Sequence, residues 1–319
     1  MKIDWRNSKA HLLLLSKFIQ ANRFEAFAAS DYWKNQWDNI LGEPSKQAIN
    51  RFIDEGMLAD VTDLNDLLSY KYKVTELKDM LKERGLPVSG RKEAMISRLV
   101  QADPEGIKKS VAELSLLKCT QRGQEIAEHY LEAEKERRVQ VERQVMEFLT
   151  DRKFREASLA VAAYEAEQVF PRGMGIDWKH HNPKQDIGTL ETVFEGKLPK
   201  ILVNLGNEKL EAFRIASAMM ALWGENKAKK WLPDDFETGS PFDFETAVRM
   251  LNFQAVHKST LERYRNEGIE YVEALPASDS CEFCRKLAGK HYKLAEAPEL
   301  PNPNCADKMG CRCCYLPVV

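Results

Sequence analysis

The sequence predicts a mainly α-helical protein, with a multi-helix body and a small C-terminal module that contains short β-strands. Three observations carry this prediction. Glycine and proline number only 16 and 13 among 319 residues and gather at a few points. Between those points, apolar residues recur at i, i+3, i+4 and i+7, which is the spacing of one helix face. Six of the seven cysteines follow the last predicted helix, from Cys281 onward.

Four regions follow one another along the chain. We expect an N-terminal helical region at 1–66, a basic helix pair at 67–103, a helical body at 104–254 and a cysteine-rich module at 255–319. The helices are expected over residues 9–29, 45–56, 73–84, 91–101, 206–231 and 244–267, and a strand over 269–275. Asp103-Pro104 interrupts the helical pattern after the pair, because proline cannot continue a helix. Acidic and basic residues are interleaved from Pro104 to Ala166, which is typical of a solvated helix face.

Composition places the chain among ordinary globular proteins. Hydrophobic residues make up 44% and charged residues 30%, and the net charge is −2. A chain so close to neutral must bind nucleic acid through a local basic patch, because its global field is weak. The apolar run Leu12–Leu15 is far shorter than the ~20 residues that span a bilayer. We therefore expect a cytoplasmic protein with no membrane partner, in which thiols are reduced.

The segment from Lys71 to Val100 predicts two short helices joined by an extended loop. Val74, Leu77 and Leu81 fall on one face of the first helix, and Gly85 is expected to end it. Eight basic and four acidic side chains leave this segment with a local charge of +4. A positive patch beside a helix N-terminus can hold a DNA phosphate.

This helix–extended–helix segment resembles the SAP domain, a small module of chromatin and DNA-repair proteins. The resemblance covers residues 71–101 and is carried by Val74, Leu77, Leu81, Gly85-Leu86, Ser89-Gly90, Lys92, Ile96 and Arg98-Leu99. It implies binding to double-stranded DNA, often AT-rich, with modest sequence selectivity. By analogy, phosphate contacts are expected at Lys73, Lys78, Ser89, Gly90, Arg91 and Lys92. The alternative is a helical hairpin that packs on its neighbours or binds a protein.

The C-terminal cysteines have the spacing of a metal site. Cys281-x-x-Cys284 supplies two thiolates from one loop, and a second group follows at Cys305, Cys311, Cys313 and Cys314. Such pairs of soft ligands are typical of tetrahedral Zn²⁺. We expect Zn²⁺ at Cys281, Cys284, Cys311 and Cys313, with Cys305 as the substitute and His291 as a weaker option. A closed shell of four thiolates indicates a structural site. The alternative is a set of free or redox thiols.

Residues 255–317 are also similar to the C-terminal cysteine module of the phage Mu F-like head-morphogenesis (minor capsid) proteins. The shared pattern consists of Asp279, Cys281, Cys284, Leu287-Ala-Gly289-Lys-His-Tyr292, the stretch from Pro298 to Pro303, and Cys311-Arg312-Cys313. The family commonly has His-Pro before its third cysteine, where this chain has Asn302-Pro303. An insertion also separates Cys305 from Cys311. The resemblance implies a phage or prophage setting.

The sequence contains no catalytic constellation that we identify, so we do not expect an enzyme. The leading hypothesis is a bacterial or prophage-derived protein that binds duplex DNA, with a zinc-stapled C-terminal module. The helical body then serves as a scaffold or as a surface for protein partners. The alternatives are a phage head-assembly protein and a DNA-acting enzyme, such as a nuclease, with a dispersed active site.

Overall fold

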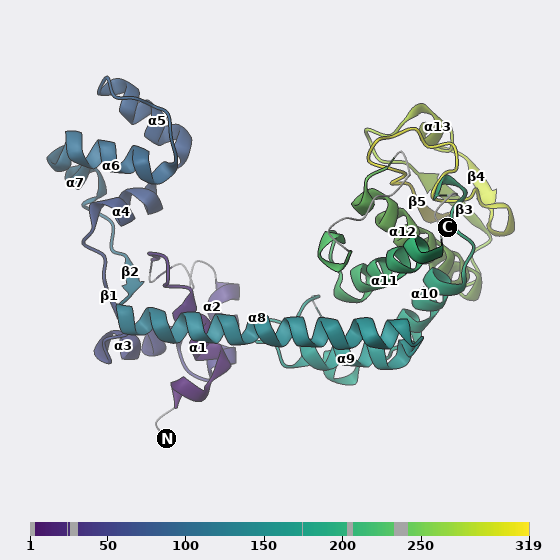
Figure 1. Ribbon diagram of the computed structural model, residues 1–319, viewed down its shortest axis with the longest axis horizontal. Helices are drawn as coiled ribbons and strands as arrows, with labels where there is room; N and C mark the ends of the chain where they lie inside the picture. Colours follow the sequence, from purple (N-terminus) through teal and green to yellow (C-terminus); the bar gives the residue numbers. More distant parts are fainter. Residues whose placement is uncertain are drawn as a thin grey trace. The chain divides into compact units, whose positions relative to one another are not determined.

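The structure, a computed structural model, describes residues 4–23, 25, 31–173, 175–202, 207–232 and 242–318. It is mainly helical with a small three-stranded sheet near the C-terminus, which confirms the predicted fold class (Figure 1). The helices are α1 (Lys9–Ser16), α2 (Asp31–Leu41), α3 (Ser45–Asp54), α4 (Leu64–Lys71), α5 (Val74–Glu83), α6 (Lys92–Ala102), α7 (Pro104–Val111), α8 (Gln121–Thr150), α9 (Phe154–Ala166), α10 (Lys184–Glu195), α11 (Asn207–Trp223), α12 (Phe244–Asn266) and α13 (Glu282–Arg285). The strands are β1 (Leu58–Asp60), β2 (Leu117–Cys119), β3 (Tyr271–Leu275), β4 (His291–Lys293) and β5 (Cys314–Val318).

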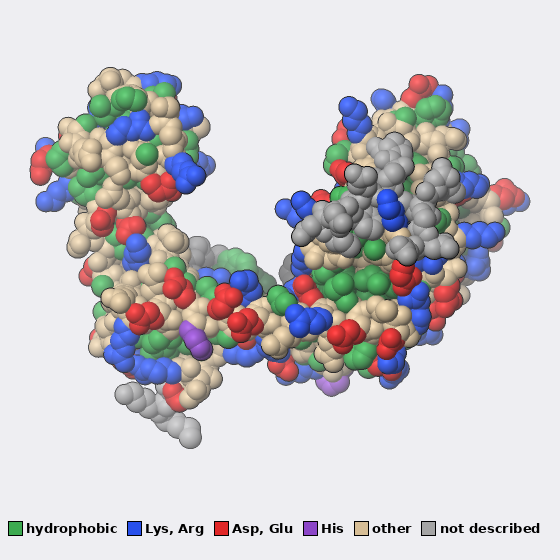
Figure 2. Space-filling view, viewed as in Figure 1, with side chains coloured by type: hydrophobic (Ala, Val, Ile, Leu, Met, Phe, Trp, Pro, Cys, Tyr) green, Lys and Arg blue, Asp and Glu red, His purple; other side chains and the backbone are tan. Residues whose placement is uncertain are grey.

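The chain divides into two compact units, Met1–Arg137 and Arg138–Val319, and the boundary between them falls inside α8. Acidic and basic side chains alternate along the visible face of α8, as its interleaved sequence predicts (Figure 2). None of the described helices is both long and apolar enough to cross a membrane.

A short antiparallel ladder organises the first unit. β1 pairs with β2 so that Leu58 lies opposite Cys119 and Asp60 opposite Leu117. Helices α4 to α7 all lie between these two strands in the sequence, so this helical module leaves the ladder and returns to it. A Cβ at Gly123, in the first turn of α8, would lie 2.0 Å from the carbonyl oxygen of Met57. Only glycine therefore lets α8 begin so close to β1.

The second unit has an apolar core between α9, α10, α11, α12 and the last turns of α8. Trp223 is fully buried there, and the guanidinium of Arg138 lies 3.8 Å from the centre of its ring. Glu142 forms ion pairs with Arg138 (2.7 Å) and Lys230 (2.9 Å). Met219 and Met220 of α11 are buried in the same core.

The C-terminal sheet has the order β4-β3-β5, and both pairings are antiparallel. β3 precedes the cysteine-rich loops and β5 follows them. The register sets Leu275, the last residue of β3, opposite Cys314, the first residue of β5. The loops that carry the other cysteines therefore begin and end in paired strands.

Some predicted boundaries are wrong. The helix expected at 9–29 ends at Ser16, while residues 24 and 26–29 of that prediction lie outside the described part of the chain. The helix expected at 206–231 ends at Trp223, because Gly224 adopts a positive φ of 57° and stops it. The strands β1 and β2 were not predicted, because three residues are too few to show an alternating pattern.

Candidate nucleic-acid interface and candidate metal centre

The helical module of α4 to α7 has its own apolar core. The spacing that predicts α5 and α6 places one face of each helix inward, and α4 and α7 cover that face. The buried side chains are Leu67, Leu68, Leu77, Leu81, Met95, Ile96, Leu99, Ile107, Val111 and Leu116. This core is larger than two helices alone provide. The domain boundaries at 66/67 and 103/104 remain predictions. Buried side chains of this one core lie on both sides of the boundary at 103/104.

The loop between α5 and α6 is fixed by two glycines and one arginine. Gly85 (φ 64°) ends α5, and Gly90 (φ 110°) precedes α6. Arg98 donates from its two terminal nitrogens to the carbonyl oxygens of Pro87 and Ser89, and from Nε to that of Ala94 (3.0 Å). A Cβ at Gly90 would lie 3.2 Å from Arg98 Nη2. Arg98 therefore holds the loop, although its charge belongs to the predicted basic patch.

Both helices of the pair begin with a basic N-cap. Lys73 precedes α5 and Arg91 precedes α6, and neither side chain caps its helix. The neighbouring helices differ, because Asp63 accepts bonds from the first turn of α4 and Asp103 from that of α7. The backbone N–H of Lys73 donates to the carboxylate of Glu76 (2.7 Å). A cationic side chain cannot accept an N–H bond, so neither N-cap side chain caps the N–H groups of its own first turn. Such a helix end favours an anion.

The six predicted DNA contacts separate into two kinds. Lys73, Lys78, Ser89, Gly90 and Arg91 are exposed. Within the described residues, the three cations of this group have no acidic side chain within ion-pair distance. The sixth residue, Lys92, is half-buried, and its Nζ donates to the carbonyl oxygen of Ser69 (2.7 Å).

The Lys92 bond brings the beginning of α6 close to the end of α4. Since α5 begins only three residues after α4, both basic N-caps lie in the same part of the module. Other bases of the segment have partners: Lys82 pairs with Asp79 (3.0 Å), Arg84 with Asp103 (2.9 Å), and Lys71 donates to the carbonyl of Ser110. Lys and Arg side chains lie over the visible surface of this module (Figure 2).

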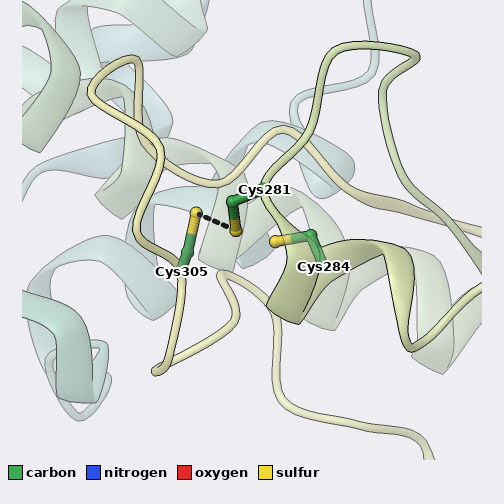
Figure 3. A group of neighbouring side chains, drawn as sticks. All are labelled: Cys281, Cys284 and Cys305. Carbon is green, nitrogen blue, oxygen red and sulfur yellow. Dashed lines mark hydrogen bonds between the residues drawn. The ribbon is translucent and has the colours of Figure 1, made fainter.

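Five cysteine thiols gather in the second unit. Cys281, Cys284 and Cys305 form one group, and Cys284, Cys311 and Cys313 form another; within each group the sulfur atoms lie within 4.8 Å of one another. Figure 3 shows the first group, where the sulfurs of Cys281 and Cys305 are 3.8 Å apart. Four of the five cysteines are buried, and Cys281 is half-buried. A buried, all-sulfur donor set at these distances fits a soft metal ion.

Hydrogen bonds and burial shift the pKa values of these thiols in opposite directions. Burial raises the pKa of Cys281, but bonds from the backbone of Ala306 and Cys284 outweigh it and lower that pKa to about 7. The bond with Cys313, opposed by burial and helped by the Asn302 backbone, lowers the pKa of Cys311 to about 6. Burial raises the pKa of Cys305 to about 11. Burial also raises that of Cys284, as does the negative charge of Cys311.

Two candidate ligands lie outside the cluster. Cys314 is exposed at the start of β5, and His291 is exposed in β4; neither belongs to the two groups found within the described residues. Cys119, in the first unit, is buried, and burial raises its pKa to about 12.

Asn302 is a residue of the cluster that the sequence did not single out. It is 94% buried, since its relative exposure is 6%. Its backbone N–H donates to Cys311 Sγ (3.2 Å) and its Nδ2 donates to Cys284 Sγ (3.7 Å). Its signal in the sequence is its position between the two groups of cysteines, directly before Pro303.

A second unpredicted cluster joins α9 to α10. Ser158 Oγ donates to Asp186 Oδ2 (2.5 Å), and His181 Nε2 lies 2.8 Å from the same oxygen and 3.3 Å from Ser158 Oγ. A catalytic triad requires the acid and the serine on different ring nitrogens. Here both contact Nε2, and Ser158 is buried. The cluster is therefore a structural link.

Comparison with known proteins identifies one part of the chain. No curated protein and no solved structure matches it. Residues 71–104 match the family profile of the SAP domain, and the matched segment holds α5, the glycine-containing loop and α6. The chain therefore contains a SAP domain, at residues 71–104.

Proposed function

We propose that the protein binds double-stranded DNA through the SAP domain, with phosphates held where α5 and α6 begin. The observation that carries this proposal is the pair of exposed basic N-caps, Lys73 and Arg91, whose side chains do not cap α5 and α6. Exposed backbone N–H groups beside a cation suit a phosphate oxygen. Ser89 and Gly90 bring further exposed backbone to the same place.

The contact set proposed here is Lys73, Lys78, Ser89, Gly90 and Arg91. Lys92 is proposed to act by holding α6 against α4, because its ammonium group already donates to Ser69. Few phosphates are then contacted, so binding is expected to be weak and sensitive to salt, with a slope of log K against log salt of about 0.9 for each phosphate.

Fluorescence anisotropy of the full chain with labelled duplexes of high and low AT content tests this function. We expect binding to both at low salt, with a modest preference for AT-rich sequence. Absence of binding to either duplex at low salt would refute the proposal.

We also propose that the cysteine cluster binds one structural Zn²⁺ and that no position is left open for substrate. Support comes from the number of thiols, their burial and their mutual distances. Four thiolates complete the tetrahedral shell of Zn²⁺, and its binding then contributes to folding. Metal analysis of protein purified under reducing conditions should find one zinc per chain; a metal-free, folded protein would exclude the site.

A second candidate function is assembly of a phage head, with the SAP domain acting on the packaged DNA. It rests on the sequence resemblance of residues 255–317 to head-morphogenesis proteins. One contact favours the motif as a structural unit: Arg312 forms ion pairs with Asp279 (2.8 Å) and Asp307 (2.9 Å), which joins its two ends. Co-sedimentation of the tagged chain with capsid precursors tests this role, and its absence from them would exclude it.

A further inference from the structure

The cysteine cluster holds more thiols than one ion needs. Five sulfur atoms meet there, and a tetrahedral Zn²⁺ takes four. The two groups share Cys284, so an ion bound by the whole cluster must take ligands from both. Three features of the structure indicate which of the five cysteines are ligands.

The first observation is the set of sulfur–sulfur distances. With Zn–S bonds of about 2.3 Å, the edge of a ZnS₄ tetrahedron is about 3.8 Å. The sulfurs of Cys281 and Cys305 are 3.8 Å apart, and those of Cys284 and Cys311 are 4.0 Å apart. These two pairs share no atom, so each can supply one edge of a tetrahedron. Cys311 is not grouped with Cys281 and Cys305 within 4.8 Å, so a bound ion must draw the two pairs together.

The second observation is the distribution of N–H donors. Thiolate ligands are stabilised by N–H groups that point at sulfur. Cys281 accepts from the backbone of Ala306 (3.4 Å) and Cys311 from that of Asn302 (3.2 Å). The backbone of Asp307 favours the thiolate of Cys305. Within the described residues, no N–H donates to the sulfur of Cys313.

The third observation is the position of Asn302. It donates to Cys284 and to Cys311, the two members of one edge, and these cysteines come from different loops. Its carbonyl oxygen also accepts from the backbone of Cys305 (3.0 Å), and its Oδ1 accepts from that of Asn304 (3.0 Å). One buried residue thus fixes the geometry of three of the thiols.

We propose that Cys281, Cys284, Cys305 and Cys311 hold the ion, with Asn302 as the positioning residue that joins Cys284 to Cys311 and Cys313 outside the ligand set. This inference rests on the metal site proposed above. It differs from the set expected from the sequence, because Cys305 takes the place of Cys313. Cys313 then acts as a buried core residue beside Tyr315.

Cobalt(II) substitution of the full chain tests the ligand set. The thiolate-to-cobalt charge-transfer band grows with the number of bound thiolates, so loss of one ligand should lower its intensity by about a quarter. We expect that loss for Cys305→Ser and Cys311→Ser, and an unchanged band for Cys313→Ser. A helical circular dichroism spectrum confirms folding, and Cys→Ala variants replace any serine variant that fails to fold.

Asn302→Ala and Asn302→Asp test the positioning role. Alanine removes the Nδ2 donor, so the thiolate of Cys284 gives up its electron more readily and the charge-transfer band should move to longer wavelength. Aspartate places an acceptor against the thiolates and should weaken metal affinity by about 10-fold to 100-fold. Asn304→Asp is the matched control: Asn304 is exposed and its bond to Asn302 uses the backbone, so neither quantity should change.

The outcomes separate the two proposals. A wild-type chain that takes up neither Zn²⁺ nor Co²⁺ refutes the metal site itself. A chain that binds one ion, but loses a thiolate in Cys313→Ser and keeps all of them in Cys305→Ser, overturns only the ligand set. An unchanged band and unchanged affinity in both Asn302 variants overturn the role of Asn302.

Discussion

Replacing Lys73 and Arg91 by alanine should remove two phosphate contacts from the DNA complex while leaving the SAP domain folded. Both side chains are exposed and neither caps its helix, so the apolar core between α5 and α6 is untouched. Each phosphate contact contributes about 0.9 to the slope of log K against log salt. Two lost contacts therefore lower that slope by about 1.8, and at about 0.1 M salt they weaken binding by roughly 60-fold.

Fluorescence anisotropy over a series of salt concentrations measures the slope and the affinity together. Lys82→Ala is the control, because it removes a cation from the same domain whose ammonium group is already paired with Asp79. This variant should change the slope of log K against log salt by less than half the amount expected for one phosphate contact. If the double variant keeps the affinity and slope of the wild type, the phosphates do not lie at the two helix N-termini and the proposed interface is wrong.

Three further predictions follow from the packing. Leu81→Ala should lower the free energy of unfolding of the SAP domain by about 3 kcal/mol, since this side chain is fully buried; urea denaturation measures the loss, and a change below about 1 kcal/mol would contradict the core described above. Gly90→Ala should lower stability by about 1–3 kcal/mol and weaken DNA binding, because φ is positive there and the new Cβ meets Arg98; Gly188→Ala, which has open space on a helix, should be neutral or stabilising. Burial raises the pKa of Glu142, but its bonds to Lys230 and Arg138 outweigh it and hold that pKa below its ordinary 4.5. Ionised Glu142 therefore stabilises the fold above its pKa, and this stability is lost as the pH falls and the carboxylate is protonated. Between about pH 6 and about pH 3, the melting temperature should drop less in Glu142→Gln than in the wild type. An equal drop in the two proteins would refute this prediction.

The helices of the SAP domain were predictable almost to the residue. Their signals are local: an apolar face at one spacing and a glycine after α5. The roles of its cations were not predictable in the same way. Whether Lys92 and Arg98 face solvent or a carbonyl oxygen depends on α4 and on the path of the loop, which no local pattern encodes.

The gathering of the C-terminal cysteines was predictable from the sequence, and their arrangement was less so. Cys281-x-x-Cys284 and the later cysteines indicate a thiolate site, and the structure gathers them. Sequence spacing alone does not rank Cys305 against Cys313, because the insertion between Cys305 and Cys311 can fold in many ways. The contribution of Asn302 was hidden for the same reason, since an amide becomes a thiolate partner only when its loop returns to the cluster.

The β1–β2 ladder makes the module of α4 to α7 an insertion that could be removed or replaced. The module leaves the first unit at Asp60 and re-enters it at Leu117, and these two residues face each other in the ladder. A two-residue Asn-Gly turn between neighbouring antiparallel strands can close such a gap. Deleting α4 to α7 in this way should leave a folded chain that keeps the cysteine cluster and loses the proposed DNA binding. A foreign domain could be inserted between Asp60 and Leu117 in the same way, so the proposed DNA-binding module could be replaced without redesigning the rest of the protein.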